Sequence, residues 1–259
     1  MCELLAIIAN KQVPITLSWS GFKNRADYNG DGWGLTSHRE DGFKVWKNPI
    51  SANEDPVVNE FLDPQFKTHL LLSHVRYAVT PEKSMENTQP FTASIEGNVW
   101  AFVGTMNDSC KVTSRFKETV KDRCQGTTGT EVLFHMLAKE IENGSVARII
   151  HALGIQIQKV IEDISPGAQF SFILSNGAET FAYRFRKPLF YLNRKPPYDS
   201  KRVKMSDSDF EICLDYKKEN SEIATILATN EMTNEGWEIF PNRTLCSITY
   251  DKVCTILTI

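Results

Sequence analysis

Cys2 is the residue in this sequence with the clearest capacity for covalent chemistry. If the initiator Met1 is removed, Cys2 carries a thiol and a free α-amine on one residue. The α-amine has an ordinary pKa of about 7.7–8.0, close enough to the thiol value of about 8.5 to act as its base near neutral pH. Cys2 thus offers a nucleophile and a general base together. The alternative is a cysteine that stands at this position by chance.

Short segments spread along the chain occur together with Cys2. In order, the segments are Cys2-Glu3-Leu4-Leu5, Asp31-Gly32-Trp33-Gly34, Ser73-His74-Val75-Arg76-Tyr77-Ala78, Glu86-Asn87-Thr88-Gln89-Pro90-Phe91, Gly126-x-Thr128-x-Thr130-Glu131, and Leu227-Ala228-Thr229-Asn230-Glu231 followed by Trp237. Their order and spacing together resemble the class II glutamine amidotransferase domain, the N-terminal nucleophile (Ntn) type, and in particular its stand-alone bacterial members. The resemblance spans essentially the whole chain.

This resemblance implies a fold and a reaction. The fold is α+β, a four-layer αββα sandwich of the Ntn-hydrolase type, formed by residues 1–259 as a single domain. The thiol attacks a glutamine side-chain amide, a γ-glutamyl thioester forms, ammonia leaves, and water then frees glutamate. Neither a cofactor nor a metal is expected. The expected partners are glutamine or an analogue and a synthase that uses the ammonia.

The resemblance also assigns roles to individual residues. Cys2 is the nucleophile, and Arg76 holds the substrate carboxylate, for which a planar guanidinium is well shaped. Trp33, Gly34 and Asn87 shape the substrate pocket. Two of these assignments have a structural alternative: Arg76 could pair with a carboxylate of the protein, and Trp33 could pack in the core.

The sequence departs from the family where the oxyanion hole is expected. Gly104-Thr105-Met106 stands in place of the family's His-Asn-Gly turn, whose asparagine side chain and glycine N–H stabilise the developing negative charge. Loss of one such donor typically costs about 10²–10³ in rate. The oxyanion candidates are therefore Thr105, Met106 and, in an alignment shifted by two residues, Asn107.

Two further departures concern substrate binding. Gly129 replaces the aspartate that binds the α-ammonium group of glutamine in the family, and Val79 replaces a threonine or asparagine. Three hypotheses stay open. The protein hydrolyses glutamine, or it hydrolyses a different carboxylate-bearing amide that lacks a free α-ammonium, or it is a catalytically impaired or inactive homologue that binds a small molecule.

Hydrophobic patterns predict the elements that position these residues. Apolar side chains at helical spacing predict a helix over 130–143, with Glu131 in its first turn, and a second helix over 145–164. The polar stretch 194–220 is predicted to be an exposed loop. Short apolar or alternating runs predict strands over 4–9, 35–37, 42–47, 69–78, 98–103 (interrupted by Gly104), 170–174, 180–185, 189–192, 223–228, 245–250 and 253–257.

Composition excludes several classes of function. The 29 basic and 32 acidic side chains leave a net charge of −3, unlike the concentrated positive surface of a nucleic-acid binder. There is no apolar run of the roughly 18–20 residues that a membrane span needs. The six cysteines include no Cys-x-x-Cys pair, so we expect no metal site and, apart from Cys2, ordinary free thiols in the reducing cytoplasm.

Overall fold

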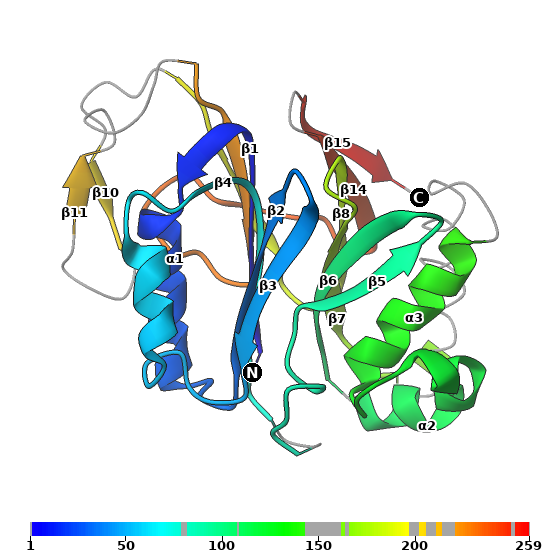
Figure 1. The fold of residues 1–259 in the computed structure, drawn as a ribbon. Coiled ribbons are helices and arrows are strands. Elements are labelled where there is room, and N and C mark those ends of the chain that lie inside the picture. The colour runs from blue at the N-terminus through cyan, green and yellow to red at the C-terminus, as the bar shows by residue number, and fades with distance from the viewer. Residues whose placement is uncertain are drawn as a thin grey trace.

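Two antiparallel β-sheets form the framework of the protein in a computed structural model (Figure 1). The structure describes residues 2–78, 82–107, 109–142, 162–163, 166–196, 202–205, 211–213, 221–249 and 252–258. Within these residues the first sheet has seven strands in the order β13-β9-β12-β1-β4-β2-β3. They are β1 (Glu3–Pro14), β2 (Trp33–Arg39), β3 (Gly42–Asn48), β4 (Lys67–Val75), β9 (Phe190–Arg194), β12 (Ala224–Ala228) and β13 (Glu238–Ile239).

The second sheet has six strands within the described residues, in the order β15-β14-β8-β7-β6-β5. They are β5 (Phe91–Ile95), β6 (Asn98–Met106), β7 (Phe170–Ser175), β8 (Glu179–Phe185), β14 (Thr244–Thr249) and β15 (Lys252–Thr258). A separate antiparallel pair joins β10 (Arg202–Lys204) to β11 (Glu211–Cys213). Within the described part of the chain the helical elements are α1 (Thr16–Lys23), α2 (Ser109–Val120), α3 (Gly129–Ile141) and the short 3₁₀ segments η1 (Asn24–Asp27), η2 (Pro56–Leu62) and η3 (Lys121–Arg123).

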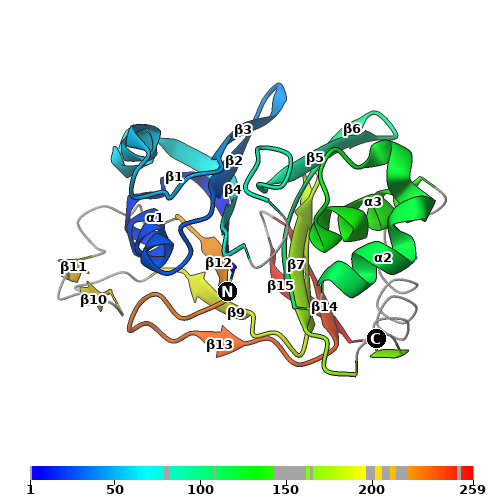
Figure 2. The ribbon, with the colours of Figure 1, turned by 90° about the horizontal axis from the view of Figure 1, so that it is seen from below.

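The sheets pack face to face, with helices on both outer sides (Figures 1 and 2). Successive side chains of a strand point to opposite faces, so both faces of a central strand must be covered. In β1, Leu4, Ala6 and Ile8 belong to the core between the sheets. The intervening Leu5, Ile7 and Ala9 pack in the core beneath α1. A third core joins the second sheet to α3, where the Phe102 and Phe134 rings stack at 5.3 Å. The expected αββα sandwich is therefore confirmed.

Most of the expected elements are present. The helix over 130–143 is α3, and Thr128 caps it by accepting a hydrogen bond from the Glu131 N–H. The strand over 98–103 continues through Gly104 to Met106, so the expected interruption is wrong. The expectation of a plain loop over 194–220 is also wrong, because β10 and β11 lie there. Helices α1 and α2 were not predicted, and nearly all of the helix expected over 145–164 lies outside the described residues.

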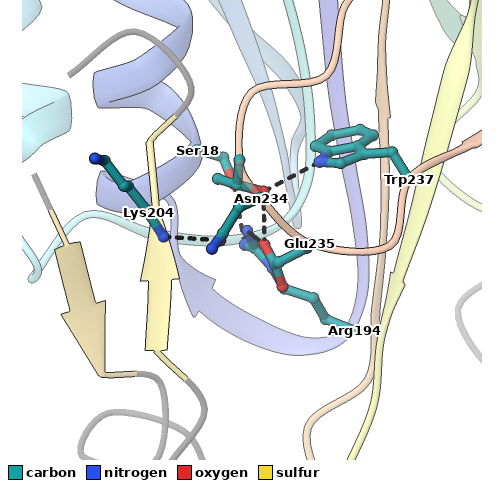
Figure 3. Close-up of polar contacts among 7 residues, drawn as sticks. Ser18, Arg194, Lys204, Asn234, Glu235 and Trp237 are labelled. Atoms are coloured by element: carbon teal, nitrogen blue, oxygen red, sulfur yellow. Dashed lines mark hydrogen bonds and ion pairs between the residues drawn. The ribbon is translucent and has the colours of Figure 1, made fainter. Parts of the chain in front are cut away.

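A buried ion pair anchors the segment that follows β12 (Figure 3). Arg194 of β9 and Glu235 lie 2.5 Å apart, with their side chains only 6% and 1% exposed. A second guanidinium nitrogen of Arg194 donates to the Ser18 hydroxyl of α1 at 3.3 Å. Thr233 donates to Glu235 and accepts from the Trp237 indole. This cluster ties the first sheet to α1.

One cysteine does not match the expectation of free thiols. Cys2 and Cys124 are free, but Cys246 of β14 is disulfide-bonded, so the prediction of an ordinary thiol is wrong for Cys246. Spacing along the chain gave no signal for this bond, because a disulfide depends on which residues the strands bring side by side. Among the described residues, no helix combines the length and apolar character needed to cross a membrane.

Candidate active site

A cavity of about 90 Å³ lies where the ends of strands from both sheets meet the start of α3. Six of the residues singled out from the sequence line it, together with six that were given no pocket role. The first group is Cys2, Arg76, Asn87, Gly104, Thr105 and Met106, and the second is His74, Tyr77, Ala78, Gln89, Thr128 and Thr130. Segments far apart in the chain therefore converge on the predicted nucleophile.

The Cys2 side chain is held against the backbone of Tyr77. Its sulfur accepts a hydrogen bond from the Tyr77 N–H at 3.4 Å, and its S–H faces the Tyr77 carbonyl at 3.5 Å. Burial raises the pKa of the Cys2 thiol, while the Tyr77 hydrogen bond and the positive charges of the N-terminus, Arg76 and Lys187 act in the opposite direction. The thiol is therefore protonated near neutral pH and needs a base to become a nucleophile.

Residues near the end of β12 hold the chain directly after Cys2. The Leu4 N–H donates to the Thr229 hydroxyl at 3.0 Å, and the Thr229 N–H donates to the Leu4 carbonyl at 3.2 Å. The Glu3 carboxylate accepts hydrogen bonds from Thr229 and from the Asn230 side chain. The late Thr229-Asn230 segment thus positions the start of β1, directly after Cys2.

Arg76 is 4% exposed and lines the cavity just beyond the end of β4. Its guanidinium donates to the carbonyls of Asp31 and Glu82 at 3.5 and 3.3 Å. Backbone bonds extend this contact, from Arg76 N–H to Gly32 at 2.8 Å and from Asp31 N–H to Arg76 at 3.0 Å. Burial lowers the pKa of Arg76, but a guanidinium keeps its charge in proteins. The cavity therefore has a fixed cation on its wall.

The Asp31 side chain supports the loop that follows Arg76. Its carboxylate accepts a hydrogen bond from the Ala78 N–H at 2.7 Å and pairs with Lys83 at 2.5 Å. Although burial acts to raise it, these contacts hold the pKa of Asp31 below its usual value. The sequence Asp31-Gly32 is therefore part of the support of Arg76.

Asn87 lines the cavity, but its side-chain amide is already hydrogen-bonded within the protein. Its Nδ2 donates to the Glu82 carbonyl at 3.0 Å, and its Oδ1 accepts from the Thr127 N–H at 2.8 Å. Glu82 also accepts from Arg76. The contacts of Asn87 thus join the Arg76 loop to the segment before α3.

Gln89 is a cavity residue for which the sequence suggested no role. Its Oε1 accepts from the Gly104 N–H at 2.6 Å, and its Nε2 donates to the Gly104 carbonyl at 2.9 Å. The pairing of β5 with β6 starts at Phe91 and Phe102, so the Gln89 side chain continues the ladder where β5 has not yet begun. The Gly104 N–H is consequently engaged and does not point a free donor at the cavity.

Among the three oxyanion candidates, Thr105 has the most suitable polar group. Thr105 is 5% exposed and lines the cavity, and its hydroxyl has no hydrogen-bond partner among the described residues. Met106 also lines the cavity but offers only its backbone and a thioether. Asn107 is outside the lining, and its amide bonds to Gly167 and Gln169 instead. The shifted alignment is therefore not supported.

Trp33 and Gly34 do not line the cavity, in contrast to the prediction. The Trp33 indole is 1% exposed, packs against Trp19 and Phe61, and donates to Asp55 at 3.0 Å. A Cβ at Gly34 would come within 1.9 Å of the Gln89 carbonyl, so the absence of a side chain permits close packing there. Trp33 thus packs in the core, as the structural alternative describes.

Two positions singled out as departures from the family lie away from the cavity or outside the described residues. Gly129 is buried at the start of α3 and is not among the lining residues. Val79 lies outside the described residues.

His74 and Lys187 are further polar residues near Cys2. His74 is 1% exposed and lines the cavity, and neither ring nitrogen has a hydrogen-bond partner among the described residues. Burial lowers the pKa of His74 to about 3, so the ring is neutral near pH 7. Lys187 is 7% exposed and its charge acts on Cys2 and Glu3. Only the position of His74 two residues before Arg76 gave a sequence signal, and Lys187 had none.

The described residues of the cavity wall carry a positive charge but no negative charge. Among the described lining residues there is one guanidinium, that of Arg76, and there is no carboxylate. A ligand carboxylate would find a counter-ion, whereas a ligand ammonium would have to be buried without one, which is costly. With a thiol, a guanidinium and an unpartnered hydroxyl in the wall, the site is suited to attack on an acyl group of a carboxylate-bearing molecule.

The chain is similar to several known proteins. It matches the family model of glutamine amidotransferases class-II over residues 1–256. An uncharacterized protein of Methanocaldococcus jannaschii is 32% identical over 249 residues, covering 93% of this chain and 67% of that protein. A predicted glutamine amidotransferase from Pseudomonas aeruginosa PA01 has a similar structure, with a TM-score of 0.64, 19% identity, and coverage of 99% of this chain and 100% of the other. Glutamine phosphoribosylpyrophosphate amidotransferase from B. subtilis also gives a TM-score of 0.64, at 14% identity, over 99% of this chain and 49% of the other.

Proposed function

The chain belongs to the class II glutamine amidotransferases, and from this premise we propose that it releases ammonia from a side-chain amide through a thioester on Cys2. The family implies glutamine as the substrate. The observation that carries the proposal is the cavity that Cys2 shares with the buried guanidinium of Arg76. A substrate whose carboxylate binds Arg76 would be oriented by a bidentate contact in a site of restricted size.

The proposed reaction has two balanced steps. Once Met1 is removed, the α-amine of Cys2 takes the thiol proton as the sulfur attacks the amide carbon. The C–N bond then breaks, the amine returns the proton to the leaving nitrogen, and ammonia departs while the acyl group stays on the sulfur. Water attacks the thioester in the second step, releasing the carboxylic acid and restoring the thiol. The Thr105 hydroxyl is the proposed donor to the oxyanion in both steps.

A second candidate substrate follows from the charge of the cavity. The described lining residues include no carboxylate, and Gly129 stands where the family has an aspartate. These observations favour an amide that carries a carboxylate but no free α-ammonium, such as an N-acylated glutamine. The proposal also includes a partner synthase that accepts the ammonia, which co-purification would detect.

A glutamine-mimicking electrophile tests the proposed nucleophile. We expect the wild-type protein to gain one covalent equivalent by intact mass, with the adduct on Cys2, and Cys2→Ala to gain none. Cys124→Ala is the matched control, because it removes another free thiol and should still be labelled. The same mass measurement reports whether Met1 is absent. The mechanism would be contradicted if Cys2→Ala were labelled, or if the wild-type protein were not labelled.

Ammonia release separates the candidate substrates. Glutamine and an N-acylated glutamine are compared with the wild type, with Cys2→Ala as the blank. Faster release from glutamine supports the family substrate, and faster release from the acylated compound supports the second candidate. Labelling of Cys2 without release from either would instead support the hypothesis of an impaired homologue that binds a small molecule.

A further inference from the structure

Three side chains with metal-binding atoms gather outside the cavity, at the start of α3. The thiol of Cys124, the carboxylate of Glu131 and the imidazole of His135 each place one ligand atom within 4.8 Å of the other two. Glu131 and His135 are four residues apart in α3 and so share one helix face. None of the three lines the candidate active-site cavity, and the proposed reaction does not use them.

His135 has a ring nitrogen that no hydrogen bond satisfies among the described residues. Its side chain is 8% exposed, and its Nδ1 is buried with no hydrogen-bond partner among the described residues. A buried polar atom without a partner is costly and is rarely left so in a native protein. At its ordinary pKa of about 6.5 an imidazole is mostly neutral near pH 7. A neutral imidazole is the form that binds a metal ion.

Glu131 is a buried carboxylate held by hydrogen bonds, and the charges of Lys47 and Lys117 act on it from beyond ion-pair distance. It is 3% exposed, and no ion-pair partner lies within 4.0 Å of it among the described residues. It accepts hydrogen bonds from the Gln125 N–H at 2.7 Å and the Gly126 N–H at 2.9 Å. Outer hydrogen bonds of this kind commonly orient a carboxylate that ligates a metal. A cation beside Glu131 would compensate its buried charge.

We propose that Cys124, Glu131 and His135 bind a zinc ion. One sulfur, one nitrogen and one oxygen donor form a set that zinc accepts, and three protein ligands leave a fourth tetrahedral position for water. The thiol proton of Cys124 passes to solvent as the sulfur–zinc bond forms. Zinc bonds of about 2.0–2.3 Å place ligand atoms roughly 3.5 Å apart, so binding requires the cluster to contract by about 1 Å.

The proposed zinc site lies behind one wall of the cavity. Glu131 holds Gln125 and Gly126, and the next residue, Thr127, donates its N–H to Asn87. Asn87 in turn lines the cavity. The zinc ion would therefore stabilise the segment that supports the active site without contacting the substrate. In the sequence the three ligands have the spacing Cys-x6-Glu-x3-His. This spacing is not one of the common metal-binding patterns, and the absence of those patterns was the reason for expecting no metal.

Cobalt absorption spectroscopy tests the site directly. The reduced, metal-stripped protein is titrated with Co²⁺, and zinc affinity is then measured by displacement of the bound cobalt. We expect one equivalent of Co²⁺ with a thiolate-to-cobalt charge-transfer band in the wild type. Cys124→Ser should lose the band, and His135→Gln should bind zinc at least about tenfold more weakly. Circular dichroism checks that each variant folds, and Cys124→Ser is the milder change because Cys124 is only partly buried.

Two control variants exclude other ligands. Cys2→Ala removes a different free thiol, and His69→Gln removes an imidazole that contacts His38 at 3.4 Å. Both should keep the band and the zinc affinity of the wild type. The proposal is overturned if the wild type shows no thiolate band, or if Cys124→Ser retains it. Loss of the band in Cys2→Ala would also overturn it, by assigning the thiolate to the active site. None of these outcomes depends on amidase activity.

Discussion

The side-chain amide of Gln89 forms two hydrogen bonds with the backbone of Gly104, at 2.6 Å to its N–H and 2.9 Å to its carbonyl. The Gln89 side chain thereby forms the hydrogen bonds that a neighbouring strand would form with β6, and it fixes the backbone just before Thr105. The arrangement also removes the Gly104 N–H from the groups that could stabilise an oxyanion. The wall of the cavity is thus shaped by a side chain that takes the place of main chain.

Replacing Gln89 should destabilise the protein. In Gln89→Ala both backbone groups of Gly104 lose their partner in a buried place, and we expect a loss of about 1–3 kcal/mol in the free energy of unfolding. Urea denaturation measures the loss. Gln65→Ala is the control, because Gln65 is exposed and its change should stay within about 0.5 kcal/mol. Equal stabilities of the two variants would contradict the role of Gln89.

The Thr105 hydroxyl should matter for rate more than for binding. Thr105→Val keeps the shape but removes the donor, and we expect kcat to fall by about 10²–10³ with little change in KM. Thr105→Ser retains a hydroxyl and should remain within several-fold of the wild type. Steady-state ammonia release provides both constants. A wild-type kcat in Thr105→Val would assign oxyanion stabilisation to another group.

Arg76 should act on the substrate carboxylate through its fork of donors. Arg76→Lys keeps the charge but cannot form the bidentate contact, so we expect kcat/KM to fall by about 10- to 100-fold, or about 1.4–2.7 kcal/mol. The control is an amide of similar size without the carboxylate, on which wild type and variant should perform alike. An equal loss on both substrates would indicate a structural role only.

The ion pair of Asp31 should make stability depend on pH. Because the pKa of Asp31 lies below its usual value of 3.8 in the folded protein, its contribution is present above that value. The contribution is lost as the pH falls through the folded pKa. Unfolding free energies of wild type and Asp31→Asn should therefore differ at about pH 6 and converge as the pH falls through the folded pKa of Asp31. A difference that stays constant over this range would contradict the assignment.

Breaking the buried pair of Arg194 and Glu235 should be costly. Glu235→Ala leaves the Arg194 guanidinium buried and uncompensated, and we expect a loss of about 3–5 kcal/mol in unfolding free energy. Glu118→Ala is the matched control, because the Lys121–Glu118 pair is 62% and 80% exposed and should contribute about 0–1 kcal/mol. Thermal and urea unfolding of the two variants measure the difference between their losses of unfolding free energy.

Elements with local signals could be predicted from the sequence. The continuous apolar run from Leu4 to Ala9 and the apolar spacing in α3 each depend on neighbours a few residues away. Helix α1 was not predicted from the sequence, because its apolar residues are buried by a tertiary contact, the packing beneath β1. The bulge-free passage of β6 through Gly104 likewise depends on Gln89, fifteen residues earlier.

The sequence by itself determined which groups are available to this protein and its family: a cysteine that could supply its own base once Met1 is removed, an arginine, and the motifs of the class II glutamine amidotransferases. Tertiary structure alone decided which of the candidate residues meet. Trp33 packs in the core and not in the cavity, whereas Gln89 and His74 line the cavity. Cys124 lies close to Glu131 and His135. The reason is physical: sheet register and burial bring distant segments together, and neither is encoded in the spacing of any single segment.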